Sequence, residues 1–143
     1  MPTVSLREVS KFFTDVPAVN RVSFDVEQGE LLVLLGPSGC GKTTTLRMIA
    51  GLEEPDGGEI FIGDKVVNAP AKGIVLPTEK RGIGMVFQSY AIWPNMKVFE
   101  NVAYPLRVRR TRPAIIRDKV MQALSLVGLE GLEERPATQL SGG

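Results

Sequence analysis

The sequence lacks any long apolar segment. Its longest purely apolar runs, such as residues 31–35, are far shorter than the roughly 20 residues that a membrane-spanning helix needs. It also lacks a second cysteine, so Cys40 cannot form a disulfide within the chain. The first residues, 1–4, lack the basic and then apolar pattern of a secretory signal. We therefore expect a cytoplasmic protein that associates with a membrane only through a partner.

The sequence is also almost without net charge. Its 17 lysines and arginines and its 16 aspartates and glutamates leave a formal charge of +1. This balance argues against wholesale binding to nucleic acid or to a membrane surface. Basic side chains do gather in one stretch, which is opposed nearby by Asp118 and which we interpret as a solvated face: Arg107, Arg109, Arg110, Arg112, Arg117 and Lys119.

The apolar content is sufficient for one globular domain. With 43% hydrophobic residues, a chain of 143 residues can bury one moderate core. Alternating apolar and polar residues predict half-buried strands at 4–9 and 22–26, and hence an antiparallel sheet near the N-terminus. The continuous apolar run at 31–35 predicts a central parallel strand that is buried on both faces, and residues 82–87 predict a further apolar strand.

The remaining patterns predict a β-hairpin and two helices. Apolar residues recur at helical spacing in both helices, and a glycine follows each of them. The expected elements are a helix over 44–50 that ends at Gly51, a hairpin of 59–62 with 65–67, and a helix over 113–127 between a Thr111 cap and a Gly128 stop.

One glycine-rich stretch carries recognisable chemistry. It reads Gly36-Pro37-Ser38-Gly39-Cys40-Gly41-Lys42-Thr43-Thr44, and its first eight residues fit the pattern of a phosphate-binding loop. Its glycines let the backbone curl so that N–H groups converge on phosphate oxygens. Lys42 supplies a positive charge for the β- and γ-phosphates, the Thr43 hydroxyl suits Mg²⁺, and the N-terminus of the next helix favours the same anion. We therefore predict that residues 36–44 bind ATP with Mg²⁺.

Two further motifs narrow the class, because kinases, GTPases, motor ATPases and transporters all share such a loop. Residues 82–88, Gly-Ile-Gly-Met-Val-Phe-Gln, resemble the Q-loop of ABC ATPases, and residues 140–143, Leu-Ser-Gly-Gly, resemble their signature motif. The similarity runs essentially the whole length and looks closest to the ATPases of bacterial importers for sugars, polyamines or ferric iron.

The resemblance implies an α/β fold of the P-loop NTPase class, ABC ATPase type. Such a fold has a parallel core sheet, an N-terminal antiparallel β-subdomain and a helical subdomain, of which this chain would contain the start. The expected domains are a nucleotide-binding core with the antiparallel subdomain over 1–88, and the helical subdomain up to the signature motif over 89–143.

The resemblance also assigns roles to single residues. Phe13 falls where such proteins place an aromatic ring against adenine, and Phe12 competes for that role. Gln88 is similar to the glutamine that joins the Mg²⁺ site and senses the γ-phosphate, so we expect it to be catalytic together with Lys42. The signature residues expected to bind the ATP of the other protomer in trans are Ser141, Gly142 and Gly143.

An assembly follows from the same resemblance. Two ATPase subunits would sandwich two ATP molecules head to tail and drive transmembrane permease subunits, without nucleic acid, from the cytoplasmic face of the inner membrane. The sequence stops at Gly143, before the Mg²⁺-binding aspartate, the water-activating glutamate and the switch histidine of the family, and it contains no histidine. We expect such a fragment to be unable to hydrolyse ATP alone. The alternatives are a non-transport ABC ATPase that acts on nucleic acid and a non-catalytic nucleotide-binding module.

Two residues near these motifs have a local explanation as well as a functional one. Cys40 lies inside the phosphate-binding loop and is either a regulatory thiol or, as we favour, a small residue tolerated at a variable position. Trp93 follows Gln88 closely and is either an anchor for the permease or part of the packing of the helical subdomain.

Overall fold

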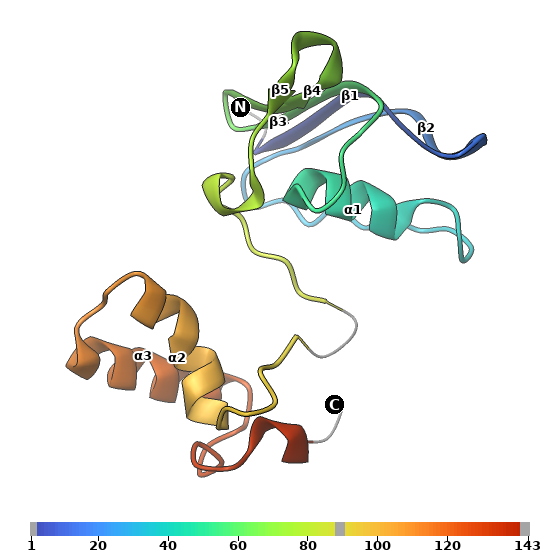
Figure 1. Ribbon diagram of the computed structural model, residues 1–143. Helices are drawn as coiled ribbons and strands as arrows, with labels where there is room; N and C mark the ends of the chain where they lie inside the picture. The colour runs from blue at the N-terminus through green and yellow to red at the C-terminus, as the bar shows by residue number, and fades with distance from the viewer. Residues whose placement is uncertain (1–2, 88–90, 141–143) are drawn as a thin grey trace. The chain divides into compact units, whose positions relative to one another are not determined.

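The computed structural model describes residues 3–87 and 91–140 (Figure 1). The chain divides into two compact units, Met1–Met85 and Val86–Gly143. The first unit carries a β-sheet and the helix α1, and the second carries the helices α2 and α3. The expected Q-loop and signature residues that lie outside the described residues are Gln88, Ser141, Gly142 and Gly143.

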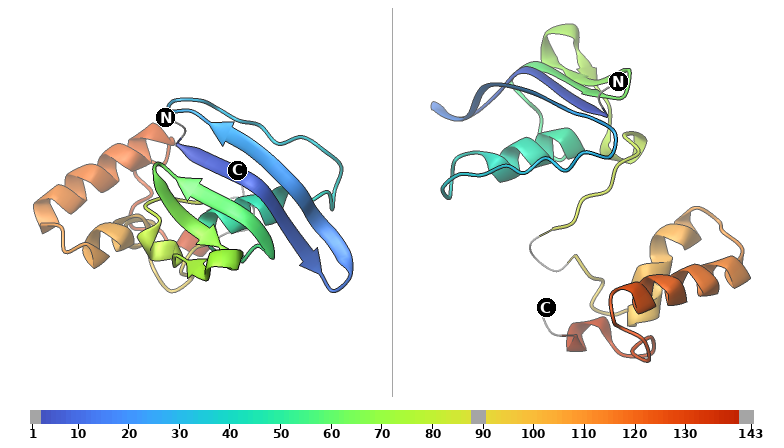
Figure 2. Two further views of the ribbon diagram at one scale, coloured as in Figure 1. Left: turned by 90° about the horizontal axis from the view of Figure 1, so that it is seen from above. Right: turned by 180° about the vertical axis from the view of Figure 1, so that it is seen from behind.

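The first unit is an antiparallel sheet with one helix on a face (Figures 1 and 2). Its strands are β1 Val4–Phe13, β2 Val16–Val26, β3 Gly57–Ile62, β4 Lys65–Ala69 and β5 Ile74–Val75. They are ordered β2-β1-β3-β4-β5, and every neighbouring pair is antiparallel. This confirms the two N-terminal strands and the hairpin. The short 3₁₀ helices η1, Pro70–Lys72, and η2, Thr78–Lys80, complete the unit.

The core of the first unit lies between the sheet and α1, Lys42–Ala50. Leu6 and Val9 of β1 and Met48 of α1 are fully buried in it. Residues three apart on a strand face opposite sides unless the strand has a bulge, and the pairing of β1 with β2 shifts register between Leu6 and Val9, where Glu8 has a φ of 49°. The bulge therefore brings both side chains into one core, where each contributes about 1.5–3 kcal/mol of burial.

The end of α1 is fixed by a buried arginine. Gly51 ends the helix with a φ of 81°, which confirms the expected stop. Arg81 is only 4% exposed, and its guanidinium donates to the carbonyls of Met48 at 2.8 Å, Ile49 at 3.0 Å and Leu76 at 2.8 Å. A Cβ at Gly51 would lie 2.6 Å from the Arg81 Nε. Gly51 is therefore required both by the left-handed turn that ends α1 and by the space that the Arg81 side chain occupies.

The α/β class is confirmed, but the expected parallel core strands at 31–35 and 82–87 are not formed. Both segments are irregular, and Leu31 and Leu35 are 87% and 88% exposed. A strand needs hydrogen-bonding neighbours along its edges, and a strand of a parallel sheet also needs cover on both faces. Among the described residues, the antiparallel sheet provides neither for these segments.

The second unit is a helix pair made of α2, Val98–Val108, and α3, Pro113–Leu126, followed by the 3₁₀ helix η3, Ala137–Gln139. The helix α3 confirms the periodic pattern at 113–127, whereas α2 was not predicted. The Thr111 cap is wrong, because the N-cap is Arg112 and the helix starts at Pro113, whose missing N–H is no loss at that position. The buried core residues are Val98, Ala103, Ile116, Val120 and Leu124.

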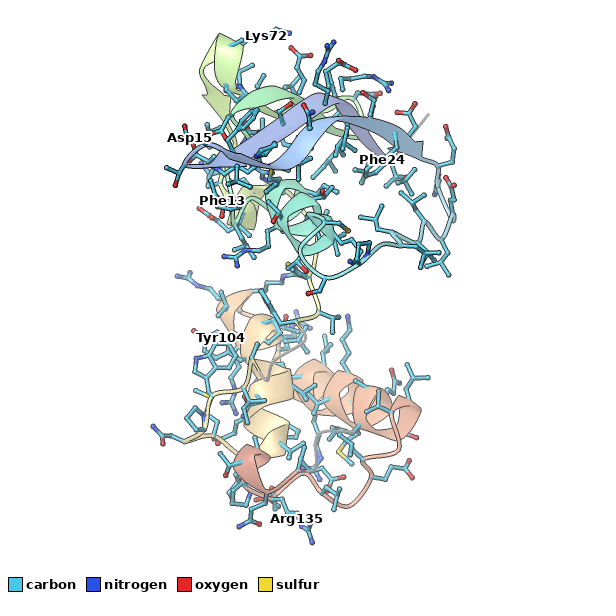
Figure 3. The ribbon with its side chains drawn as sticks, turned by 90° about the vertical axis from the view of Figure 1, so that its right-hand side faces the viewer. Phe13, Asp15, Phe24, Lys72, Tyr104 and Arg135 are labelled. Atoms are coloured by element: carbon cyan, nitrogen blue, oxygen red, sulfur yellow. The ribbon has the colours of Figure 1, made fainter. Side chains whose placement is uncertain are left out.

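The segment before α2 is tied to that helix by side chains. The Asn101 amide accepts from the Trp93 N–H at 2.8 Å and donates back to the Trp93 carbonyl at 3.2 Å. The Trp93 ring lies 4.2 Å, centroid to centroid, from the ring of Tyr104 on α2, which Figure 3 labels. Trp93 thus packs within its own unit while it stays 44% exposed. No described helix combines the length and the apolarity that crossing a membrane requires.

Candidate nucleotide-binding site

The phosphate loop, residues 36–43, leads from the irregular segment 31–35 directly into α1. The first turn of the helix is anchored on the loop, because the Thr45 N–H donates to the Gly41 carbonyl at 2.8 Å and the Thr45 hydroxyl donates to the same oxygen at 2.9 Å. Since the first N–H groups of a helix have no partner within it, they are available to an anion at this position. The order of loop and helix that the sequence predicts is therefore present.

The conformation of the loop depends on Gly41. Its φ is 89°, in the left-handed region that residues with a side chain rarely adopt. A Cβ at this position would come far inside contact distance of the Ala18 carbonyl oxygen of β2, and 3.0 Å from the Val19 Cγ2. Strand β2 therefore packs directly against the loop, and only glycine fits at position 41.

Lys42 is folded into its own loop. Its Nζ donates to the carbonyls of Gly36 and Pro37, each at 2.7 Å, and lies 3.4 Å from the Cys40 Sγ. An ammonium that is bonded to carbonyl oxygens at the centre of such a loop can exchange them for phosphate oxygens, which carry a full negative charge and bind it more strongly. The arrangement thus suits a polyphosphate, and it places the Cys40 thiol beside the same ammonium.

The threonines after Lys42 differ in exposure. Thr43 is exposed, Thr44 is half-buried, and Thr45 is buried and bonded to Gly41. Only Thr43 combines an exposed hydroxyl with a place at the head of α1, so it fits Mg²⁺, which prefers oxygen ligands and commonly shares phosphate oxygens. No group of three or more acidic, histidine or cysteine side chains that could hold a metal exists within 3–87 and 91–140.

The aromatic pair at the end of β1 is exposed. Phe12 and Phe13 are 43% and 48% exposed, and Figure 3 labels Phe13 near the end of the strand. The Lys11 Nζ lies 5.5 Å from the centroid of the Phe13 ring, held there by Glu53 at 3.1 Å and Asp56 at 3.5 Å. Burial lowers the pKa of Lys11, but these two carboxylates outweigh it and raise the pKa overall. The ring of Phe13 is thus positioned by a charged lysine, whereas Phe12 has its N–H bonded to Asp56 at 2.6 Å.

A cavity of about 370 Å³ adjoins the loop. It is bounded by Cys40, Gly41, Lys42 and Thr45, by residues of β2, and by Leu34 and Leu35. Phe13 does not line it, so the structure does not bring the aromatic ring and the loop into one cavity. A larger cavity, of about 500 Å³, lies within the second unit and contains no predicted site residue.

Comparison with known proteins identifies the family. The family model of the ABC transporter matches residues 19–143, which include the phosphate loop. The chain belongs to the ABC transporter family. It is 52% identical to the trehalose/maltose import ATP-binding protein MalK of Thermococcus litoralis over 143 residues, which are 100% of this chain and 38% of that protein.

A second group of relatives is named for a different class of solute. The chain is 51% identical to the spermidine/putrescine import ATP-binding protein PotA of Legionella pneumophila over 142 residues, which are 99% of this chain and 37% of that protein. Thus the chain spans less than two fifths of the length of either relative. The expected resemblance to sugar and polyamine import ATPases is confirmed.

The fold has a close counterpart among solved structures. A dimeric ATP-binding cassette in a post-hydrolysis state, bound to ADP and Pi, matches with a TM-score of 0.82 and 28% identity over 97% of this chain and 63% of that one. The ABC ATPase fold expected from the sequence is therefore confirmed. Sequence reasoning missed Arg81 and Lys11, since an isolated basic residue before a glycine or within a strand carries no motif.

Proposed function

We propose that this chain is the ATP-binding part of an ABC importer ATPase. The observation that carries the proposal is the Lys42 ammonium, held at the centre of a loop whose shape Gly41 and β2 determine. Such a loop presents a positive charge and converging N–H groups to one anion. Membership of the ABC transporter family supports the triphosphate of ATP as this anion.

The residues of the loop would divide the work. Its amides and Lys42 bind the β- and γ-phosphates and stabilise the charge that develops on the γ-phosphoryl group during transfer. Mg²⁺, when bound, neutralises phosphate charge, and Thr43 offers it a hydroxyl ligand. Gln88 is proposed as a second ligand and as the sensor of the γ-phosphate. Phe13 would stack on adenine, a contact worth about 1–3 kcal/mol.

The proposed partners are a second copy of the subunit and a membrane permease. Ser141, Gly142 and Gly143 would bind the ATP held by the other copy, so that ATP closes a head-to-tail dimer. The solved counterpart is a dimer with ADP and Pi, and the relatives are named as ATP-binding proteins of import systems, which supports both partners. We place the protein on the cytoplasmic face of the membrane, attached through the permease.

Calorimetric titration of the chain with Mg-ATP tests the binding step. We expect the wild-type chain to bind and Lys42→Ala to bind at least tenfold more weakly, since a charge-assisted contact contributes about 1.5–3 kcal/mol. Lys72→Ala is the matched control, because it removes an exposed lysine outside the loop. Equal affinities of Lys42→Ala and the wild type would refute the assignment of the loop.

Hydrolysis is tested in a chimera in which residues 1–143 replace the matching segment of the Thermococcus litoralis relative. We expect this chimera to hydrolyse ATP and its Lys42→Ala variant to be inactive. Binding without turnover in the chimera would instead identify the chain as a non-catalytic nucleotide-binding module. Salt-dependent binding of DNA by the chimera would favour an ATPase that acts on nucleic acid.

A further inference from the structure

A cavity of the second unit lies between α2 and α3, and the nucleotide site does not use it. It measures about 500 Å³. Three apolar side chains, Phe99, Pro113 and Ile116, line it together with Thr111 and two arginines, and we call it the α2–α3 groove. The arginines are Arg107 near the end of α2 and Arg117 in α3. The groove therefore joins an apolar surface to two cations from different helices.

The segment that carries most of this groove is the most positively charged part of the chain. Residues 107–119 contain six lysines and arginines and one aspartate, a local charge of +5. Since the whole chain carries +1, the rest of it carries −4. A segment of this charge attracts an anionic surface even though the protein as a whole is nearly neutral.

Within residues 91–140, no hydrogen bond or ion pair engages the guanidinium groups of the two arginines of the groove. Arg107 and Arg117 are both exposed. Arg117 has only a minor effect on Glu134, whose pKa is lowered first by its hydrogen bond with Lys97 and to a lesser degree by the charge of Arg117. Glu134 lies 2.6 Å from the Lys97 Nζ and is therefore already paired. The positive charge at the groove thus remains available to a ligand.

Exposed apolar side chains alternate with the basic ones beside the groove. Val108 is 65% exposed and Ile115 is 41% exposed, on either side of the connection between the two helices. Figure 1 shows this connection at one end of the helix pair. Basic residues that surround apolar tips match the boundary region of a bilayer, where phosphate groups adjoin hydrocarbon.

We propose that the α2–α3 groove binds the phosphate of an anionic phospholipid headgroup. Arg107 and Arg117 would bind the phosphodiester, Phe99 and Ile116 would contact the glycerol and the first part of an acyl chain, and Val108 and Ile115 would dip into the interface. Charge complementarity with an anionic leaflet supports this occupant. An acidic peptide would match the charge, but it would leave the apolar tips beside the groove uncovered.

Co-sedimentation of the chain with vesicles tests the proposal. We expect binding to vesicles of phosphatidylcholine with phosphatidylglycerol, and at least tenfold weaker binding to vesicles of phosphatidylcholine alone. Each basic residue near an anionic surface contributes roughly a fivefold gain in partition. The assay contains no nucleotide, so its outcome is independent of the proposed ATPase function.

Two double variants of equal charge separate a headgroup site from diffuse attraction. Arg107→Gln with Arg117→Gln removes the two arginines of the groove, whereas Arg109→Gln with Arg110→Gln removes two from outside its lining. Charge alone would cost either pair up to about 25-fold, so we expect the groove pair to lose more than this and distinctly more than the other pair. Equal losses would overturn the proposal, because they would indicate charge alone. Lys65→Gln with Lys80→Gln controls for net charge outside the second unit.

The remaining arms identify other sources of the anion. If the chain binds glycerol 3-phosphate in the groove but does not co-sediment with anionic vesicles, the lipid assignment is overturned in favour of a free phosphate ester. A glutamate-rich peptide that binds while anionic vesicles do not would overturn it in favour of a protein partner. Circular dichroism of each variant confirms that a loss of binding is not a loss of fold.

Discussion

The substitution Gly41→Ala tests whether strand β2 shapes the phosphate loop. Gly41 has a φ of 89° and lies against the Ala18 carbonyl, and Gly39, in the same loop, has a φ of 83° with no atom within 4 Å of a Cβ built there. Gly39→Ala is therefore a matched control, because the two variants share the backbone strain and differ only in the space available. The left-handed conformation costs a residue with a Cβ about 1–2 kcal/mol.

The clash at Gly41 adds to this strain. The obstacles are the backbone oxygen of Ala18 and the Val19 Cγ2 at 3.0 Å, and a strand backbone cannot move aside as a flexible side chain can. Overpacking of this kind costs about 1–3 kcal/mol. We therefore expect Gly39→Ala to destabilise the chain by about 1–2 kcal/mol and Gly41→Ala by about 2–5 kcal/mol, taking strain and overpacking together.

Thermal unfolding followed by far-UV circular dichroism measures the difference. For the first unit, Met1–Met85, 1 kcal/mol corresponds to roughly 4–8 °C in Tm, so the two variants should differ by about 4 °C or more. In titrations with Mg-ATP, Gly41→Ala should lose more affinity than Gly39→Ala, since the clash displaces the loop that binds the phosphates. Equal Tm values for the two variants would refute the argument that β2 determines the shape of the loop.

Three further perturbations probe the rest of the structure. Arg81→Met should destabilise the first unit by about 3–5 kcal/mol, because it leaves buried carbonyls without donors, and hydrogen exchange should accelerate in α1; Arg81→Lys should recover part of the loss. Glu134→Gln should make the free energy of unfolding of the second unit less dependent on pH in the acid range. Lys97 lowers the pKa of Glu134, so this stabilisation is complete above the ordinary pKa of a glutamate and is lost as pH falls through the pKa of Glu134 in the folded state. Urea unfolding at several pH values measures this dependence. Tyr104→Ala should shift the fluorescence of Trp93, the single tryptophan, and cost about 0.5–1.5 kcal/mol beyond the lost buried area; an unchanged spectrum would contradict the ring contact.

Periodic segments could be predicted from the sequence because their pattern and their partners lie close together in the chain. The strands β1 and β2 pair with each other across a short connection, and β3 and β4 form a hairpin, so alternation alone was enough. The helix α3 has an apolar face that meets α2 in the same unit. The phosphate loop was predicted for another reason, since its residue types are dictated by the anion that they bind.

The remaining features depend on contacts that no local pattern expresses. The run 31–35 has the composition of a buried strand, yet an apolar run becomes a strand only when neighbours satisfy its backbone, and the described residues provide none. The helix α2 was missed because Pro105 lies inside it and interrupts the expected pattern. The bulge at Glu8 was invisible because alternation assumes a regular strand.

The two ends of the phosphate loop therefore differ in how many contacts fix their backbone. On the α1 side, Gly41 is wedged against β2, Thr45 bonds to Gly41, and the helix ends on Arg81, so the position of Lys42 is determined by packed structure. On the other side the loop emerges from 31–35, where no strand pairing holds the backbone. The backbone of this segment therefore has fewer hydrogen-bonding partners than that of α1, and we expect amide hydrogen exchange to be faster over 31–35 than over α1.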